Sequence, residues 1–165
     1  MAQLTFKGNP VETAGTFPVV GDDAPNFILV KTDLSELSLS DLKGKKIIFN
    51  IFPSVDTAVC ALQLKKFSKI ISNMNNTILV FASLDLPFAF SRFCAAEGID
   101  NAITASDFRY RSLEKHYGAA MINGPLSGLY ARAVLVLNEQ HQVIYSELVK
   151  EITNEPNYDA AIAVL

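Results

Sequence analysis

The sequence has only two cysteines, two histidines and no tryptophan among its 165 residues. So few cysteines exclude a secreted scaffold stapled by disulfides. The two cysteines lie too far apart in the chain for a C-x-x-C motif, and the histidines, His116 and His141, do not complete a zinc-type ligand spacing with them. We therefore expect no metal and no other cofactor. Cys60 and Cys94 are either small apolar core residues or carriers of chemistry.

Long apolar runs and an excess of basic charge are also missing. No stretch approaches the roughly 18 apolar residues of a membrane span, and the first residues hold no apolar core of signal-peptide length. Lys and Arg number 14 against 17 Asp and Glu, a net charge of −3, without a basic run. A weakly acidic chain without a basic run has no positively charged segment that would bind nucleic acid or an anionic membrane. We expect a soluble, cytoplasmic protein without either partner.

The composition that is present indicates a globular chain. Half of the residues are apolar and only 19% are charged, which excludes a disordered protein. No internal repeat, low-complexity stretch or linker interrupts the sequence. We therefore interpret residues 1–165 as one domain.

The hydrophobic pattern predicts strands that alternate with helices. The predicted strands are residues 27–30, 47–52, 77–82 and 103–104, followed by an antiparallel hairpin of 131–137 and 142–148. The predicted helices follow Pro53 and cover 87–97, 108–117 and 158–165. A small hairpin of residues 4–6 and 11–13, around Gly8-Asn9-Pro10, precedes them as a decoration. This order predicts an α/β domain of thioredoxin-like type, with a mixed central β-sheet, helices on both faces and an N-terminal β-hairpin.

The helix after Pro53 is the most informative element. Pro53 cannot donate to a strand ladder and ends the preceding strand, and Ser54 or Asp56 is expected to cap the helix. An apolar stripe at steps of four and three residues predicts its buried face, with Gln63 and its lysines pointing elsewhere. The stripe consists of Cys60, Leu64, Phe67, Ile71 and Met74.

This pattern places the Cys60 thiol at the beginning of a helix that follows a buried strand. Unpaired backbone N–H groups and the positive end of the helix dipole stabilise a thiolate there. The alternative is that Cys60 is a small apolar residue that fills the interface between helix and sheet. Position alone does not separate the two readings.

The nine residues from Phe52 to Cys60 read FPSVDTAVC and contain P-x-x-x-T-x-x-C. The segment resembles the peroxidatic signature of the peroxiredoxins, and more narrowly that of their thiol peroxidase subfamily. Two later segments agree in the same order: DLPFAFSRFC over Asp85–Cys94 and GLYARAV over Gly128–Val134. The resemblance covers nearly the whole chain and implies a thioredoxin-like fold.

The resemblance also implies a role for each matching residue. Cys60 matches the nucleophile that attacks a hydroperoxide, Thr57 the hydroxyl that hydrogen-bonds thiolate and peroxide, and Arg132 the cation over the site. Pro53 matches the residue that shields the thiol. Cys94 matches the resolving cysteine, which forms an intramolecular disulfide with Cys60 that thioredoxin reduces. The family further implies a homodimer and a role in antioxidant defence and redox homeostasis.

Other readings compete with this one. A cysteine-dependent phosphatase needs an arginine six positions after the cysteine, where this chain has Lys66. A cysteine hydrolase needs a histidine base, and neither histidine has a supporting context. A thioredoxin-like binding or holdase module with buried cysteines stays open, and an arginine such as Arg132 could simply pair with a surface carboxylate.

Two further groups have open roles. Phe88, Phe90 and Phe93 are core candidates, with an apolar substrate mouth for organic hydroperoxides as the alternative. Arg92 is expected to be a surface or interface residue.

Overall fold

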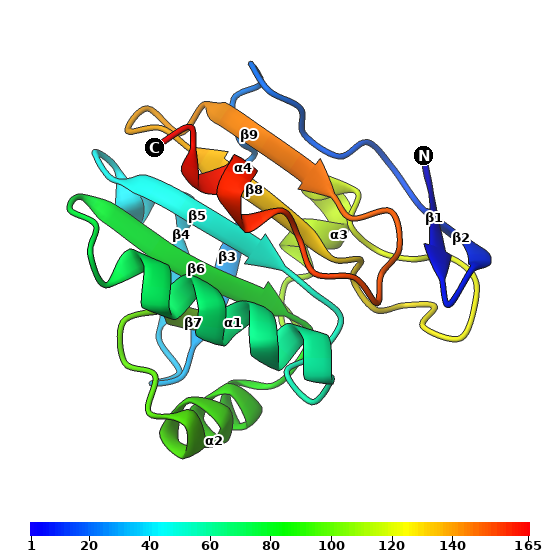
Figure 1. Cartoon of the computed structure of the whole chain (residues 1–165), viewed down its shortest axis with the longest axis horizontal. Helices are drawn as coiled ribbons and strands as arrows, with labels where there is room; N and C mark the ends of the chain where they lie inside the picture. Colours follow the sequence, from blue (N-terminus) through cyan, green and yellow to red (C-terminus); the bar gives the residue numbers. More distant parts are fainter.

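The computed structural model describes residues 1–165 as a seven-stranded sheet with helices packed on it and a separate two-stranded hairpin (Figure 1). The hairpin strands are β1 (Ala2–Phe6) and β2 (Asn9–Thr13). The sheet strands are β3 (Ile28–Lys31), β4 (Glu36–Ser38), β5 (Lys46–Ile51), β6 (Thr77–Ser83), β7 (Ile103–Ser106), β8 (Ala133–Leu137) and β9 (Val143–Leu148). The helices are α1 (Ala58–Ile71), α2 (Pro87–Glu97), α3 (Ser112–Tyr117) and α4 (Tyr158–Ile162), with a 3₁₀ turn η1 (Leu39–Leu42).

The strand order is β4-β3-β7-β6-β5-β8-β9. Strands β5, β6 and β7 are parallel, because α1 and α2 return the chain to the same end of the sheet between them. The neighbours on both sides pair antiparallel, and β8 and β9 form the predicted hairpin. The mixed sheet and the N-terminal hairpin predicted from the sequence are therefore confirmed.

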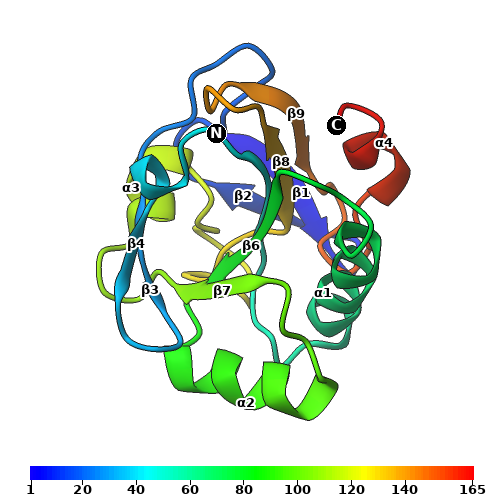
Figure 2. The ribbon, with the colours of Figure 1, turned by 90° about the vertical axis from the view of Figure 1, so that its left-hand side faces the viewer.

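Both faces of the sheet are covered, which explains the nearly continuous apolar run of β5. Ile48 and Phe52 face the cluster that holds α1, together with parts of α2 and α4, whereas Ile47 and Phe49 face the cluster that holds α3 and η1. Figure 2 shows α1 and α4 on one side of the strands and α3 on the other. Burying each of these side chains fully contributes about 1.5–3 kcal/mol.

Three predicted helix boundaries were wrong. Helix α1 ends at Ile71, so Met74 lies in the following turn. Helix α3 begins at Ser112 instead of residue 108, because Arg111 adopts a positive φ of 52° and the Asp107 carboxylate accepts hydrogen bonds from the first helical N–H groups. Helix α4 ends at Ile162, before the predicted end.

The N-terminal hairpin is tied to the segment that follows β9. The Thr5 amide donates to the Lys150 carbonyl at 2.7 Å, and the Ile152 amide donates to the Thr5 carbonyl at 2.9 Å. The Glu151 carboxylate accepts from the Gly8 amide at 2.8 Å and from the Lys7 amide at 3.2 Å. Glu151 is thus the anchor that holds the hairpin against residues 150–153.

This anchor makes a pH-dependent prediction. Hydrogen bonds from the Thr153 and Gly8 backbone, with the Thr153 hydroxyl, lower the pKa of Glu151 to about 2. A folded-state pKa below the unfolded value contributes stability above pH about 4.5, and this contribution is lost as the pH falls toward 2. We expect the Tm difference between the wild type and Glu151→Gln to be largest above pH about 4.5 and to shrink as the pH falls from there toward 2.

The matched control is Asp100→Asn, a change at an exposed aspartate in the α2–β7 connection. Thermal unfolding monitored by circular dichroism over this pH range checks the prediction. A gap between the wild type and Glu151→Gln that stays constant down to pH 2 would contradict the role given to Glu151.

Candidate active site

Cys60 lies in the first turn of α1, as predicted. Strand β5 ends at Ile51, the chain turns through Pro53, and Thr57 is the helix N-cap. The prediction that Ser54 or Asp56 caps α1 was wrong, because the Ser54 hydroxyl is engaged elsewhere. The Cys60 side chain is only 1% exposed and belongs to the cluster beneath α1.

Arg132 lies directly against this thiol. Its Nη1 atom is 3.2 Å from Cys60 Sγ and 3.0 Å from Gln63 Oε1, and its Nε donates to the Ile152 carbonyl at 2.9 Å. Arg132 as a whole is only 2% exposed, so these buried partners hold its guanidinium in place. A fixed cation and N–H donor at this distance stabilise negative charge on the sulfur. The reading of Arg132 as a surface ion-pair residue is wrong.

Gln63 was expected to point away from the buried face of α1, and this expectation was wrong. The side chain is fully buried, and its amide donates to Asn50 Oδ1 at 2.8 Å while its carbonyl oxygen accepts from Arg132. Asn50 in turn donates to the Val80 carbonyl at 3.4 Å. The available sequence signal was Asn50 itself, a polar residue in an otherwise apolar strand, which needs a buried partner.

A small pocket opens at Arg132, the residue that contacts the Cys60 thiol. Its volume is about 110 Å³, which corresponds to a few water molecules or the head of a hydroperoxide. Pro53, Thr57 and Arg132 line it, so the structure brings three of the predicted site residues to one cavity. Its rim is mainly apolar, formed by Phe6, Ala58, Val59, Leu126 and Ile152, with Thr153.

Phe6 shows that the N-terminal hairpin is more than the predicted decoration, because it forms part of this rim. The three phenylalanines considered as an apolar entrance for the substrate do not line this pocket. Phe90 is fully buried in the core, Phe93 packs at its edge, and Phe88 is 65% exposed beside a different hollow. No local pattern predicts that Phe6, so distant in the chain from Cys60, reaches the pocket.

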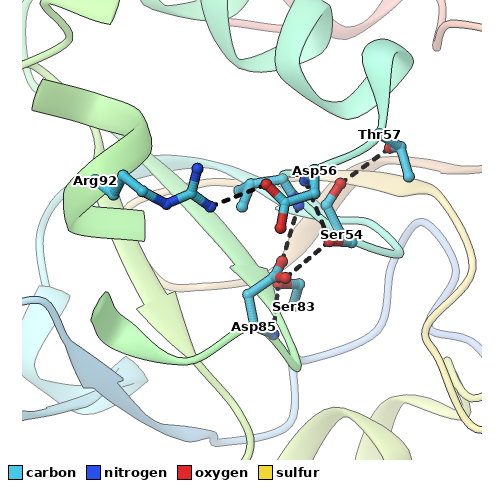
Figure 3. Close-up of polar contacts among 7 residues, drawn as sticks. Ser54, Asp56, Thr57, Ser83, Asp85 and Arg92 are labelled. Atoms are coloured by element: carbon cyan, nitrogen blue, oxygen red, sulfur yellow. Dashed lines mark hydrogen bonds and ion pairs between the residues drawn. The ribbon is translucent and has the colours of Figure 1, made fainter. Parts of the chain in front are cut away.

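The Thr57 hydroxyl is held by its own loop. It donates to the Ser54 carbonyl at 2.9 Å, as Figure 3 shows. Its single proton is used in this bond, so the oxygen keeps its lone pairs as acceptors at the pocket wall. No hydrogen bond joins the Thr57 side chain to Cys60.

The structure does not bring Cys94 to this site. Cys94 lies near the end of α2, with its Sγ 3.9 Å from Thr104 Oγ1 on β7, and both cysteines are free thiols. Arg132, which contacts Cys60, directly precedes β8, and strands β6 and β5 lie between β7 and β8. Burial raises the pKa of Cys94, which the Thr104 hydroxyl only partly offsets.

Comparison with known proteins agrees with this geometry. The family model described as Redoxin matches residues 19–162. A curated relative named thiol peroxidase, from Corynebacterium glutamicum, is 47% identical over 165 residues, which cover all of this chain and 99% of that protein. The chain belongs to the thiol peroxidase subfamily of the peroxiredoxins.

Solved peroxiredoxin structures extend the likeness to three dimensions. The peroxiredoxin-like protein from Aquifex aeolicus superposes with a TM-score of 0.93 at 42% identity, over 98% of this chain and 94% of that one. The thiol peroxidase from Chromobacterium violaceum gives a TM-score of 0.90 over 98% and 93% of the two chains. At 23% identity this second likeness concerns the fold, which confirms the thioredoxin-like class predicted from the sequence. No helix of this peroxiredoxin is long and apolar enough to span a membrane.

The buried Gln63 contact yields a prediction for catalysis. Gln63→Leu keeps the volume of the side chain but removes the Gln63 contacts of Arg132 Nη1 and Asn50 Oδ1. We expect the second-order rate constant for the first reaction with hydrogen peroxide to fall roughly tenfold, because the guanidinium loses one of its fixed acceptors. Lys69→Gln, at an exposed position of the same helix, is the control and should leave the rate unchanged. Equal rates for Gln63→Leu and the wild type, measured by quenched flow, would remove Gln63 from the site.

Proposed function

We propose that this peroxiredoxin reduces hydrogen peroxide and organic hydroperoxides through a Cys60 sulfenic acid and a Cys60–Cys94 disulfide, which thioredoxin then reduces. The observation that carries the proposal is the Arg132 Nη1 contact with Cys60 Sγ, 3.2 Å long and next to a pocket of peroxide size. We propose that the chain is a single domain that acts in antioxidant defence in the cytoplasm. There thioredoxin keeps both thiols reduced.

The environments of the two cysteines support different roles. Cys60 faces a buried guanidinium and lies in the first turn of α1, where unpaired N–H groups also favour an anion. Cys94 faces only a hydroxyl at 3.9 Å, and burial raises its pKa, which lowers the thiolate fraction at neutral pH. Cys60 is therefore the nucleophile that attacks the peroxide, and Cys94 is the resolving thiol that reacts with the Cys60 sulfenic acid.

Thiolate formation alone does not make a peroxidase. A cysteine whose pKa falls from about 8.5 to about 6 gains roughly thirtyfold in thiolate at pH 7, but loses roughly ten- to eighteenfold in nucleophilicity. The larger contribution must come from holding the peroxide in line and stabilising charge on the departing oxygen. Arg132 and the Cys60 N–H supply donors for this purpose, while Thr57 Oγ1 offers an acceptor for the peroxide O–H and Pro53 shields the site.

The proposed cycle balances in atoms and electrons. The Cys60 thiolate attacks the terminal peroxide oxygen, the O–O bond breaks, and the leaving alkoxide or hydroxide takes a proton, which yields Cys60 sulfenic acid and an alcohol or water. The Cys94 thiol then displaces water to form the disulfide. Thioredoxin supplies the two electrons that return both thiols. The apolar rim of Phe6, Leu126 and Ile152 suits the alkyl chain of an organic hydroperoxide.

The disulfide step requires the structure to open. A disulfide needs Cα atoms within about 7 Å, while Cys60 and Cys94 lie on different helices with separate partners across the sheet. We propose that the start of α1, the Cys94 helix, or both unwind before the sulfurs meet.

Oxidation of each cysteine variant tests the assignment. Cys60→Ser should not react with peroxide, while Cys94→Ser should consume about one equivalent and stop as the sulfenic acid. The wild type should lose about 2 Da after one equivalent, which marks the disulfide. Mass spectrometry of the intact chain and thioredoxin-coupled peroxide loss check this. A single turnover in Cys60→Ser but not in Cys94→Ser would reverse the two roles, and no turnover in the wild type would favour the non-catalytic binding module.

An exposed apolar patch supports the proposed homodimer. Leu34, Leu86, Phe88 and Phe108 surround a hollow of about 260 Å³ on the side of α2, and each is between 47% and 65% exposed. Clustered apolar side chains of this size usually mark an interface. We place the contact with a second copy here.

The dimer prediction uses two matched substitutions. Phe88→Asp should shift the protein from dimer to monomer, because it puts a charge into the apolar contact. Val20→Asp, at a position that is 62% exposed but outside the patch, is the control. Sedimentation velocity in reducing buffer provides the measurement. A dimer that survives Phe88→Asp at all concentrations, or a monomeric wild type, would reject this interface.

A further inference from the structure

The loop before Cys60 is hydrogen-bonded to the segment that leads into the Cys94 helix (Figure 3). The Asp85 carboxylate accepts from Ser54 Oγ at 2.8 Å and from the Val55 amide at 2.9 Å. The Ser83 hydroxyl also donates to this carboxylate, and the Asp85 amide donates back to Ser83 Oγ at 3.0 Å. One carboxylate therefore joins the end of β6 to the loop before α1.

The placement of Asp85 is not explained by the stability of its own helix. It lies two residues before Pro87, one residue ahead of the N-cap of α2. The N-cap of α2 is Leu86, without a side-chain cap, and the Asp85 carboxylate is instead directed at Ser54 and Val55. Its hydrogen bonds serve the neighbouring cysteine segment.

The same contacts reach the reactive site through Thr57. Ser54 is held through its hydroxyl by Asp85, and its carbonyl accepts the hydrogen bond of the Thr57 hydroxyl at 2.9 Å. Thr57 is both the N-cap of α1 and a wall of the pocket. The conformation of the Cys60 loop and the direction of the Thr57 hydroxyl thus both depend on Asp85.

A second link joins the same two segments but is weaker. Arg92, on α2, forms an ion pair with Asp56 at 3.0 Å, and both side chains are 64% exposed. Exposed pairs of this kind contribute little, whereas hydrogen bonds from several donors to a half-buried carboxylate are strong. The contacts of Asp85 therefore dominate the junction.

We propose that Asp85 is a positioning residue that latches the Cys60 loop in its closed form, and that release of this latch precedes the disulfide. The inference rests on the proposed function. In the closed form Thr57 is aligned for the peroxide. After Cys60 becomes a sulfenic acid, the loop must leave Asp85 before the Cys94 thiol can form the S–S bond and release water. While the latch holds, a second peroxide can oxidise the sulfenic acid to a sulfinic acid, with one alcohol or water as product.

The latch predicts opposite effects on two steps. Ser54→Ala removes the hydroxyl that Asp85 holds, but leaves the Val55 contact in place. We expect the first reaction with peroxide to slow severalfold, because Thr57 loses its support, and disulfide formation to speed up roughly tenfold, because opening becomes easier. The fraction that becomes sulfinic acid at a given peroxide excess should fall accordingly. Asp85→Asn, which removes the charge, should act in the same direction.

Quenched flow with mass spectrometry separates the steps, because the sulfenic acid, the disulfide and the sulfinic acid differ in mass. Hydrogen exchange of residues 54–60 in the reduced protein, expected to be faster in both variants, provides a readout without turnover. Asp56→Asn is the matched control: it breaks the exposed ion pair and should change neither step more than about twofold.

The outcomes separate this proposal from the function on which it rests. A wild type that forms no disulfide would overturn both. A wild type that forms it, with unchanged disulfide rates in Ser54→Ala and Asp85→Asn, would overturn the latch alone, as would a slowing of both steps together. Effects of Asp56→Asn equal to those of Ser54→Ala would show that the Arg92–Asp56 ion pair holds the loop, and would reject the role given to Asp85.

Discussion

The buried guanidinium of Arg132 is the charge around which the site is assembled. A cation removed from water is costly unless its N–H groups are matched by acceptors. Ile152 supplies a carbonyl, Gln63 an amide oxygen and Cys60 a sulfur, and no buried side-chain nitrogen or oxygen lacks a partner. These partners come from the segment after β9 and from two successive turns of α1. The contacts of the Arg132 guanidinium therefore hold α1 in position against the end of the sheet where β8 begins and β9 ends.

The rest of the fold supports these partners. Asn50 on the central strand holds Gln63, and the Thr5–Ile152 bond ties the N-terminal hairpin to the segment that accepts from Arg132 Nε. The two faces of the loop before α1 have different tasks: Thr57 faces the pocket, whereas Ser54 faces Asp85. Buried partners hold Arg132, whereas a few hydrogen bonds and one exposed ion pair join the Cys60 loop to the segment that leads into α2 and to α2 itself. This combination suits the proposed cycle, in which the site first aligns a peroxide and then opens.

The sequence predicted what depends on local pattern. The strand, Pro53 and the apolar stripe of α1 place Cys60 in the first helical turn, and the order of strands and helices predicts the mixed sheet. Contacts between distant segments were missed, because no local pattern encodes them: Gln63 looked like a solvent-facing residue of α1, and Phe6 like part of an isolated hairpin. The start of α3 was wrong because the buried Asp107 carboxylate, which binds two helical amides, overrides the propensity of residues 108–111.

The most direct test of this account is the second-order rate constant of the reduced protein with hydrogen peroxide in Arg132→Met, measured in a single turnover beside Arg132→Lys. Methionine fills the space without charge, and lysine keeps the charge without the planar fork that spans Ile152 and Gln63. The account predicts a loss of roughly tenfold or more for methionine and a smaller loss for lysine. A rate in Arg132→Met equal to that of the wild type, in a protein with unchanged thermal stability, would contradict it.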